Sequence, residues 1–197
     1  IKKQKELFIL AGLSAGLAAW TKNEGILFAI ASCIAILLAY RNNLKTTFWW
    51  FILGFIFPMA IVVFYKIALA PSGDLFSAPS EQIYHFIDLN RHQMILERLL
   101  GSIKSWGNWG LLSVYALFFG ISGIKKSNSA ILAGFIMLVL QLFGYYLIFL
   151  VTPHSLEWHL LAFPRILFQV TPLFFFFYFS IVRAPESIFQ SGKVALE

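Results

Sequence analysis

The sequence predicts an all-α protein, a polytopic membrane helical bundle with about six transmembrane helices and an external amphipathic helical segment. Hydrophobic residues make up 59% of the 197 residues and charged residues only 12%, whereas soluble domains contain about 25% charged residues. Twenty-two Phe and six Trp add apolar bulk that suits lipid contact and interfacial anchoring. So few charges cannot cover a water-soluble surface, and we expect residues 1–197 to form a single transmembrane domain.

The first two apolar stretches, residues 7–20 and 25–40, predict short helices joined by a tight turn. At 1.5 Å per residue, 16 residues span only about 24 Å, which is less than the hydrocarbon core of about 30 Å. The turn at residues 21–24 is therefore expected near or below the lipid headgroups. Gly12 and Gly16 lie four apart on the first helix, a spacing that lets helices pack closely in lipid.

A third spanning helix is expected over residues 47–70. Trp49 and Trp50 are typical of a membrane interface, and Pro58 predicts a kink in the middle of the helix. The Pro-Ser-Gly-Asp sequence of residues 71–74 has the composition of a turn and ends this helix.

The long polar segment at residues 71–106 is the predicted external amphipathic part of the chain. Its apolar residues recur at roughly helical spacing, while Arg91, His92 and Glu97 contribute to a polar side. Ser80 is suited to an N-cap. We expect one or two helices that lie on the membrane surface.

The remaining apolar stretches predict spanning helices over residues 108–123, 129–151 and 163–182. A polar loop at residues 152–159 separates the last two. The chain starts at Ile1 rather than at Met, so we expect it to be part of a longer protein whose beginning precedes this residue.

The distribution of Lys and Arg predicts the orientation of the chain. If the amino end is cytoplasmic and every helix crosses, nine cations lie inside and six outside, and the bias is strongest in the short loops, where the positive-inside rule applies best. The turn at Lys22, the segment 71–106 and the loop around His159 then share the external face, together with every histidine and six of the nine acidic residues.

Several function classes are excluded by what the sequence lacks. It contains no Gly-rich phosphate loop, no Ser nucleophile elbow and no Cys/His zinc pattern. Its one cysteine, Cys33, excludes an intramolecular disulfide. The net charge of +6 comes from scattered residues, which indicates membrane topology rather than a nucleic-acid partner. We expect no cofactor, although a divalent metal could assist.

Lys22 and Glu24 form the first candidate site, because they place a cation and a carboxylate at the tip of the predicted hairpin. Ionisable groups at membrane depth are costly and are usually paired or functional. One interpretation is an anion site with Lys22 toward a phosphate and Glu24 orienting it. The other is a helix-turn-helix cap with Lys22 among the headgroups.

Arg165 and His159 form the second candidate, at the start of the last apolar stretch. An unpaired Arg there would be expensive, and a guanidinium fits two phosphate oxygens. Snorkelling to the interface is the alternative. His159 and Glu157 could act as acid–base or metal groups, but the spacing of His154 and His159 does not match a helical metal pair. The polar residues around His85 and His92 are interpreted as a solvated helix face.

At these residues the chain resembles a known family. Residues 10–25 resemble the "GLxxGLAALTKNEG" helix tip of bacterial GT-C type membrane glycosyltransferases, which are related to the dolichyl-phosphate-mannose protein mannosyltransferases and the lipid A aminoarabinose transferases. A second family stretch, close to "WHL…R…Q..P", is matched by Trp158, His159, Arg165, Gln169 and Pro172.

The resemblance implies a bacterial inner-membrane enzyme that moves a sugar from a polyprenyl-phosphate carrier to a lipid, glycan or protein acceptor on the external side. It implies that Lys22, Glu24 and Arg165, with His159 as a further candidate, bind the carrier phosphate or organise the site. The catalytic Asp or Glu of the family is expected upstream of Ile1. The catalytic residue is therefore unknown, and no metal ligand is predicted.

Two other functions use the same residues differently. A transporter or flippase subunit for an amphipathic anion would bind its cargo with the same cations, but such proteins favour internal repeats and broken helices. The sequence shows no repeat, and only Pro58 indicates a break. A non-catalytic membrane scaffold would not need Lys22 or Arg165 at all.

Overall fold

The computed structural model describes residues 2–70, 79–106, 109–120, 129–153 and 155–182. Every regular element in these ranges is helical, which confirms the all-α prediction. Three stretches of helix in them, within residues 41–68, 129–151 and 156–181, are long and apolar enough to cross a membrane. By length and composition, therefore, the chain is a membrane protein.

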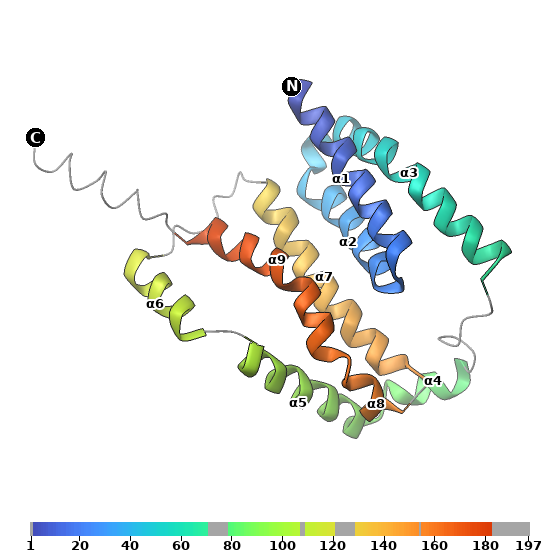
Figure 1. Ribbon diagram of the computed structural model, residues 1–197, viewed down its shortest axis with the longest axis vertical. Helices are drawn as coiled ribbons and strands as arrows, with labels where there is room; N and C mark the ends of the chain where they lie inside the picture. The colour runs from blue at the N-terminus through green and yellow to red at the C-terminus, as the bar shows by residue number, and fades with distance from the viewer. Residues whose placement is uncertain (1, 71–78, 107–108, 121–128, 154, 183–197) are drawn as a thin grey trace, which may run out of the picture.

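The first half of the chain forms one layer of three helices that lie side by side (Figure 1). These are α1 (Lys2–Thr21), α2 (Asn23–Ala39) and α3 (Leu44–Ala68), and the short 3₁₀ turn η1 (Arg41–Asn43) connects the last two. The first helix begins five residues earlier than expected from hydropathy, because Lys and Glu are good helix formers that hydropathy does not count.

Glycines bring α1 and α3 into close contact. A Cβ atom added to Gly12 would overlap the carbonyl of Phe51, and one added to Gly54 would overlap the carbonyl of Ile9. The helix α3 continues through Pro58, whose ring lies against Gly16. Small residues on facing helices therefore set the distance between these two helices, as is common in membranes.

The second layer consists of α7 (Ser129–Val151) and α9 (Phe163–Ile181), which run past each other in Figure 1. The two layers meet where α2 packs on α7, with the side chain of Leu27 against Gly144. Buried apolar side chains of α7, α8 and α9 form the largest core cluster of the described residues. Within it, the rings of Phe149 and Phe163 stack on each other. This packing fixes α9 beside the tip of the first hairpin.

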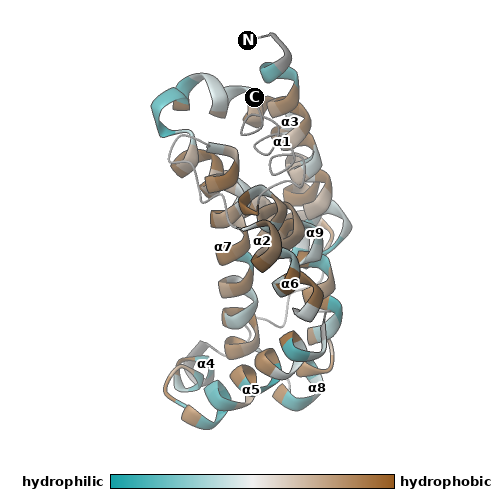
Figure 2. Ribbon diagram, turned by 90° about the vertical axis from the view of Figure 1, so that its left-hand side faces the viewer, coloured by the Kyte–Doolittle hydropathy of each residue, from teal (hydrophilic) through white to brown (hydrophobic). Residues whose placement is uncertain are grey.

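Three further helices gather at the end of the bundle that lies away from the amino terminus (Figures 1 and 2). They are α4 (Pro79–His85), α5 (Leu89–Trp106) and α8 (Leu156–Leu160). Figure 2 shows polar turns in these helices, whereas the bundle itself is largely apolar. The segment 71–106 thus contains two helices, within the expected one or two, and residues 71–78 lie outside the described ranges.

Arg91 attaches α5 to the end of α7. Its Nη2 donates to the carbonyls of Thr152, at 2.7 Å, and Phe149, at 3.3 Å. These carbonyls lie at the helix end, where the helix itself supplies no donor. Burial lowers the pKa of the Arg91 guanidinium, and the nearby Asp88 carboxylate opposes that shift.

The fourth expected spanning helix differs most from the structure. It corresponds to α6 (Trp109–Phe119), which has 11 residues and a length of about 16 Å. Residues 108 and 121–123 of the expected helix lie outside the described ranges. Both α2 and the described part of α6 are apolar, but each is shorter than a membrane span. Three helices, rather than the expected six, thus meet the length and hydropathy of a span within the described ranges.

Candidate functional site

The turn between α1 and α2 is as short as a connection between helices can be. Lys22 is the one residue between them, and its extended backbone (φ −156°, ψ 160°) reverses the chain. Thr21 Oγ1 donates to the carbonyl of Ala18 at 2.8 Å, and Gly25 N donates to the carbonyl of Lys22 at 3.0 Å. A Cβ atom at Gly25 would overlap the Ala18 carbonyl. The tight turn therefore requires glycine here.

A cavity of about 270 Å³ opens beside this turn, and we call it the tip cavity. The first hairpin, α7 and α9 all contribute to its lining. Its lining residues are Ala18, Thr21, Lys22, Glu24, Gly25, Phe28, Gln141, Tyr145 and Gln169.

Two of the four sequence-predicted site residues, Lys22 and Glu24, line this cavity. Arg165 is not a lining residue, but its Nη2 lies 4.0 Å from Glu24 Oε1. The side chain of Arg165 is 64% exposed and that of Glu24 is 25% exposed. Exposed ion pairs at this distance contribute about 0–1 kcal/mol to stability. The guanidinium is therefore held loosely and remains available to an anion.

The other polar contacts of the turn, among the described residues, do not involve the ammonium of Lys22. Lys66, at the end of α3, donates to Asn23 Oδ1 at 2.8 Å. This bond ties the third helix to the start of α2. Among the described residues, no ion pair or hydrogen bond is found for the ammonium of Lys22. The two positive charges of Lys22 and Arg165 therefore exceed the single negative charge of Glu24.

The tip cavity lies below the end of the bundle, as the short first hairpin predicts. Tyr145 lies six residues, or about 9 Å along the helix, before the end of α7 at Val151. Gln169 lies the same distance after the start of α9 at Phe163. Both helices thus place the cavity about 9 Å inside the ends of α7 and α9.

One wall of the tip cavity was not predicted from the sequence. Gln141 is 5% exposed, and no described residue donates a hydrogen bond to its Oε1. Tyr145 is 3% exposed, and its hydroxyl donates to Gln169 Oε1 at 3.5 Å. The signal was present, since a glutamine near the centre of a 23-residue apolar helix is unusual and often functional.

His159 lies apart from the other predicted site residues. It pairs with the Thr152 hydroxyl through Nδ1 at 2.8 Å and stacks on Trp158. It does not line the tip cavity. In the structure His159 connects α8 to the end of α7. His154 lies outside the described residues.

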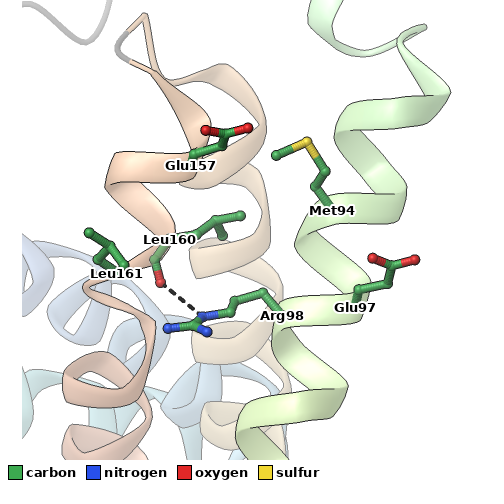
Figure 3. A pocket seen from close by; sticks show the side chains of 6 residues that line it. All are labelled: Met94, Glu97, Arg98, Glu157, Leu160 and Leu161. Atoms are coloured by element: carbon green, nitrogen blue, oxygen red, sulfur yellow. Dashed lines mark hydrogen bonds between the residues drawn. The ribbon is translucent and has the colours of Figure 1, made fainter.

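A second, larger cavity of about 390 Å³ lies between α5 and α8, and we call it the surface cavity. Figure 3 shows its lining, Met94, Glu97, Arg98, Glu157, Leu160 and Leu161.

The charged groups of the surface cavity do not converge on a common point. Arg98 Nε donates to the Leu160 carbonyl at 3.3 Å, and Glu97 accepts from Gln93 at 2.7 Å. The carboxylates of Glu97 and Glu157 project from different helices and do not approach each other (Figure 3). The larger cavity is therefore the weaker candidate, because Arg98 and Glu97 already bind protein atoms.

In the described ranges no three His, Cys, Asp or Glu side chains lie close enough to hold a metal ion. His92 binds the Tyr146 hydroxyl through Nδ1 and the Phe86 carbonyl through Nε2. It attaches α5 to α7 rather than forming the solvated helix face expected from the sequence.

The tip cavity can thus bind an anion beside Lys22 and Arg165 and a neutral polar group beside Gln141. No family model, curated protein or solved structure matches the chain.

Proposed function

We propose that this chain is part of a GT-C type membrane glycosyltransferase and binds the phosphate of a polyprenyl-phosphate sugar donor in the tip cavity. The sugar passes to a lipid, glycan or protein acceptor on the external side. One observation carries the proposal: Lys22 and Glu24 line one cavity, and Arg165, from a segment about 140 residues away, contacts Glu24. A cap and a snorkelling arginine would not need to share a site.

The chemistry of glycosyl transfer fits this arrangement. When the bond from sugar to phosphate breaks, negative charge grows on the departing phosphate oxygens. Fixed cations stabilise that charge most strongly where water is excluded. Lys22 supplies a point charge, and Arg165 supplies a planar pair of donors that matches two phosphate oxygens. Glu24 holds Arg165 near this position without neutralising both cations.

The depth of the cavity supports a lipid-linked rather than a water-soluble donor. The cavity lies about 9 Å inside the ends of α7 and α9. We place this end of the bundle outside and the amino end in the cytoplasm of a bacterial inner membrane, in accord with the distribution of Lys and Arg.

The proposal is tested with the full-length protein in lipid nanodiscs, supplied with a polyprenyl-phosphate hexose and its acceptor. Lys22→Ala and Arg165→Ala should each lower sugar transfer by about 100-fold, the effect of removing one donor to a developing oxyanion. Lys45→Ala and Arg41→Ala remove the same charges at the opposite end of the first layer and should leave transfer unchanged.

Two outcomes would contradict the proposal. If Lys22→Ala and Arg165→Ala transfer sugar as fast as the matched controls while remaining folded, the cations have no role and a scaffold is favoured. If the protein moves the lipid across a reconstituted membrane without transferring sugar, it is a transporter of an amphipathic anion.

A further inference from the structure

Gln141 is a buried polar side chain that the fold does not satisfy. It lies twelve residues after the start of α7 at Ser129 and ten before its end at Val151. The side chain is 95% buried, and no described residue donates a hydrogen bond to its Oε1. Buried carbonyls are nearly always hydrogen-bonded, and leaving one without a donor is costly. Since Gln141 lines the tip cavity, a ligand in that cavity can supply the donor.

The neighbours of Gln141 make the same wall a neutral hydrogen-bonding surface. Tyr145, one turn along α7, donates to Gln169 of α9. The amide of Gln169 also carries two N–H donors. The wall therefore offers both acceptors and donors and carries no charge, which is the complement of a hydroxyl group, because a hydroxyl both donates and accepts.

A phosphate group alone cannot supply the hydrogen-bond donor that Gln141 Oε1 lacks. A phosphodiester has no O–H, so it cannot donate to a carbonyl oxygen at neutral pH. Its charge is matched by Lys22, which also lines the cavity, and by Arg165, which pairs with Glu24. The donor for Gln141 must come from the group that the phosphate carries.

We propose that the tip cavity recognises a lipid phosphodiester whose headgroup carries a hydroxyl, and that Gln141 Oε1 accepts a hydrogen bond from this hydroxyl. Tyr145 and Gln169 form the rest of this hydroxyl subsite. The inference rests on the proposed function and deepens it, because it separates the residues that read the headgroup from those that bind the phosphate. The volume of about 270 Å³ lies below the range of about 300–1,000 Å³ for whole small-molecule ligands, so only the headgroup is enclosed.

The experiment measures binding of three lipids to the chain in nanodiscs. The first is a polyprenyl-phosphate hexose, the second is the same polyprenyl phosphate with a methyl ester in place of the hexose, and the third is phosphatidylglycerol. The first and third carry hydroxyls, whereas the second does not. The variants are Gln141→Leu, with Gln93→Leu on the exposed face of α5 as the matched control, and Lys22→Ala.

The expected result is a selective loss. Gln141→Leu should weaken binding of the hexose lipid about fivefold to tenfold, the effect of one hydrogen bond, and leave the methyl ester unchanged. Lys22→Ala should weaken both lipids equally, and Gln93→Leu neither. Gln141→Leu should also raise the melting temperature without ligand, since it removes an unsatisfied buried carbonyl, and this shows that the variant folds.

The outcomes separate the two proposals. If Lys22→Ala weakens both lipids but Gln141→Leu changes neither, or changes both alike, the hydroxyl subsite is refuted while the phosphate site stands. If phosphatidylglycerol binds as tightly as the hexose lipid and depends on Gln141, the hydroxyl contact is supported and the glycosyl donor is contradicted. If no lipid binds, or Lys22→Ala has no effect, both proposals fail.

Discussion

The tip cavity and the surface cavity contain similar chemistry but differ in what their polar groups already bind. Each is lined by one cation and at least one carboxylate, and the surface cavity is the larger by about 120 Å³. In the surface cavity Arg98 donates to a backbone carbonyl and Glu97 accepts from Gln93. At the tip cavity the lining residue Glu24 approaches Arg165 at 4.0 Å, and Gln141 Oε1 has no donor among the described residues. Unsatisfied polar groups, rather than volume, therefore favour the tip cavity as the candidate binding site.

Depth contributes a second difference. The tip cavity lies inside the bundle, about 9 Å from the ends of α7 and α9. The surface cavity lies between short amphipathic helices at the end of the bundle. Electrostatic interactions are stronger where water is excluded. A cation of equal charge should thus contribute more to ligand binding at the tip.

The first prediction concerns the contact by which Arg91 attaches α5 to the end of α7. Arg91→Ala deletes the donors to the carbonyls of Phe149 and Thr152, and hydrogen bonds to a charged group contribute about 1.5–3 kcal/mol. The free energy of unfolding should fall by about this amount. Hydrogen exchange should show α5 detaching, while lipid binding at the tip cavity persists. Loss of lipid binding together with α5 would show that the two cavities are not independent.

The second prediction concerns the turn itself. Gly25→Ala places a Cβ atom on the Ala18 carbonyl, and overpacking of this kind costs about 1–3 kcal/mol. Thermal unfolding should show the loss, and lipid binding should weaken because Lys22 and Glu24 move.

Gly101→Ala is the matched control for the turn. A Cβ atom at Gly101 meets no atom within 4 Å, so this variant should be stabilised by up to about 1 kcal/mol through helix propensity. Equal effects of the two substitutions would refute the close contact at the turn.

The third prediction is that one substitution stabilises the unliganded protein and weakens lipid binding. Gln141→Leu removes a buried carbonyl without a donor, and the penalty for such a group is about 1–3 kcal/mol. The unliganded protein should therefore become more stable by about 1 kcal/mol, as measured by thermal unfolding in nanodiscs. A loss of stability would mean that Gln141 is already satisfied in the unliganded protein.

The smallest effect is expected at the ion pair. Glu24→Gln removes the partner of Arg165, but the arginine side chain is 64% exposed and the pair is long. We expect the free energy of unfolding to change by less than about 1 kcal/mol and the change to disappear at high salt. A larger, salt-independent change would show that the pair is buried in the membrane-embedded protein.

The bounds of a helix could be predicted from the sequence where the helix ends coincide with changes in polarity. The predicted helix at residues 129–151 has the bounds of α7, and that at 163–182 ends one residue beyond α9. The helix α1 extends to Lys2, because hydropathy marks the apolar part of a helix and not its charged first turns. The expected helix at residues 108–123 is described as the 11 residues of α6, since an apolar run does not determine helix length.

The candidate site was predictable only in part. Lys22, Glu24 and Arg165 were identifiable, because ionisable residues next to apolar stretches are rare. Their meeting depends on α2 packing against α7, a long-range contact in which Leu27 lies on Gly144. Such a contact leaves no local pattern in the sequence. The wall formed by Gln141 was missed although a glutamine near the centre of an apolar helix is itself a local signal.

The most direct measurement of the central claim compares one cation from each cavity. The dissociation constant of a polyprenyl-phosphate hexose is measured in nanodiscs for Arg165→Ala and Arg98→Ala. Removing Arg165 should weaken binding about tenfold, the effect of a lost charged hydrogen bond, whereas removing Arg98 should change it less than about twofold. Equal affinities for Arg165→Ala and the unaltered protein, or a larger loss for Arg98→Ala, would contradict the assignment of the phosphate site to the tip cavity.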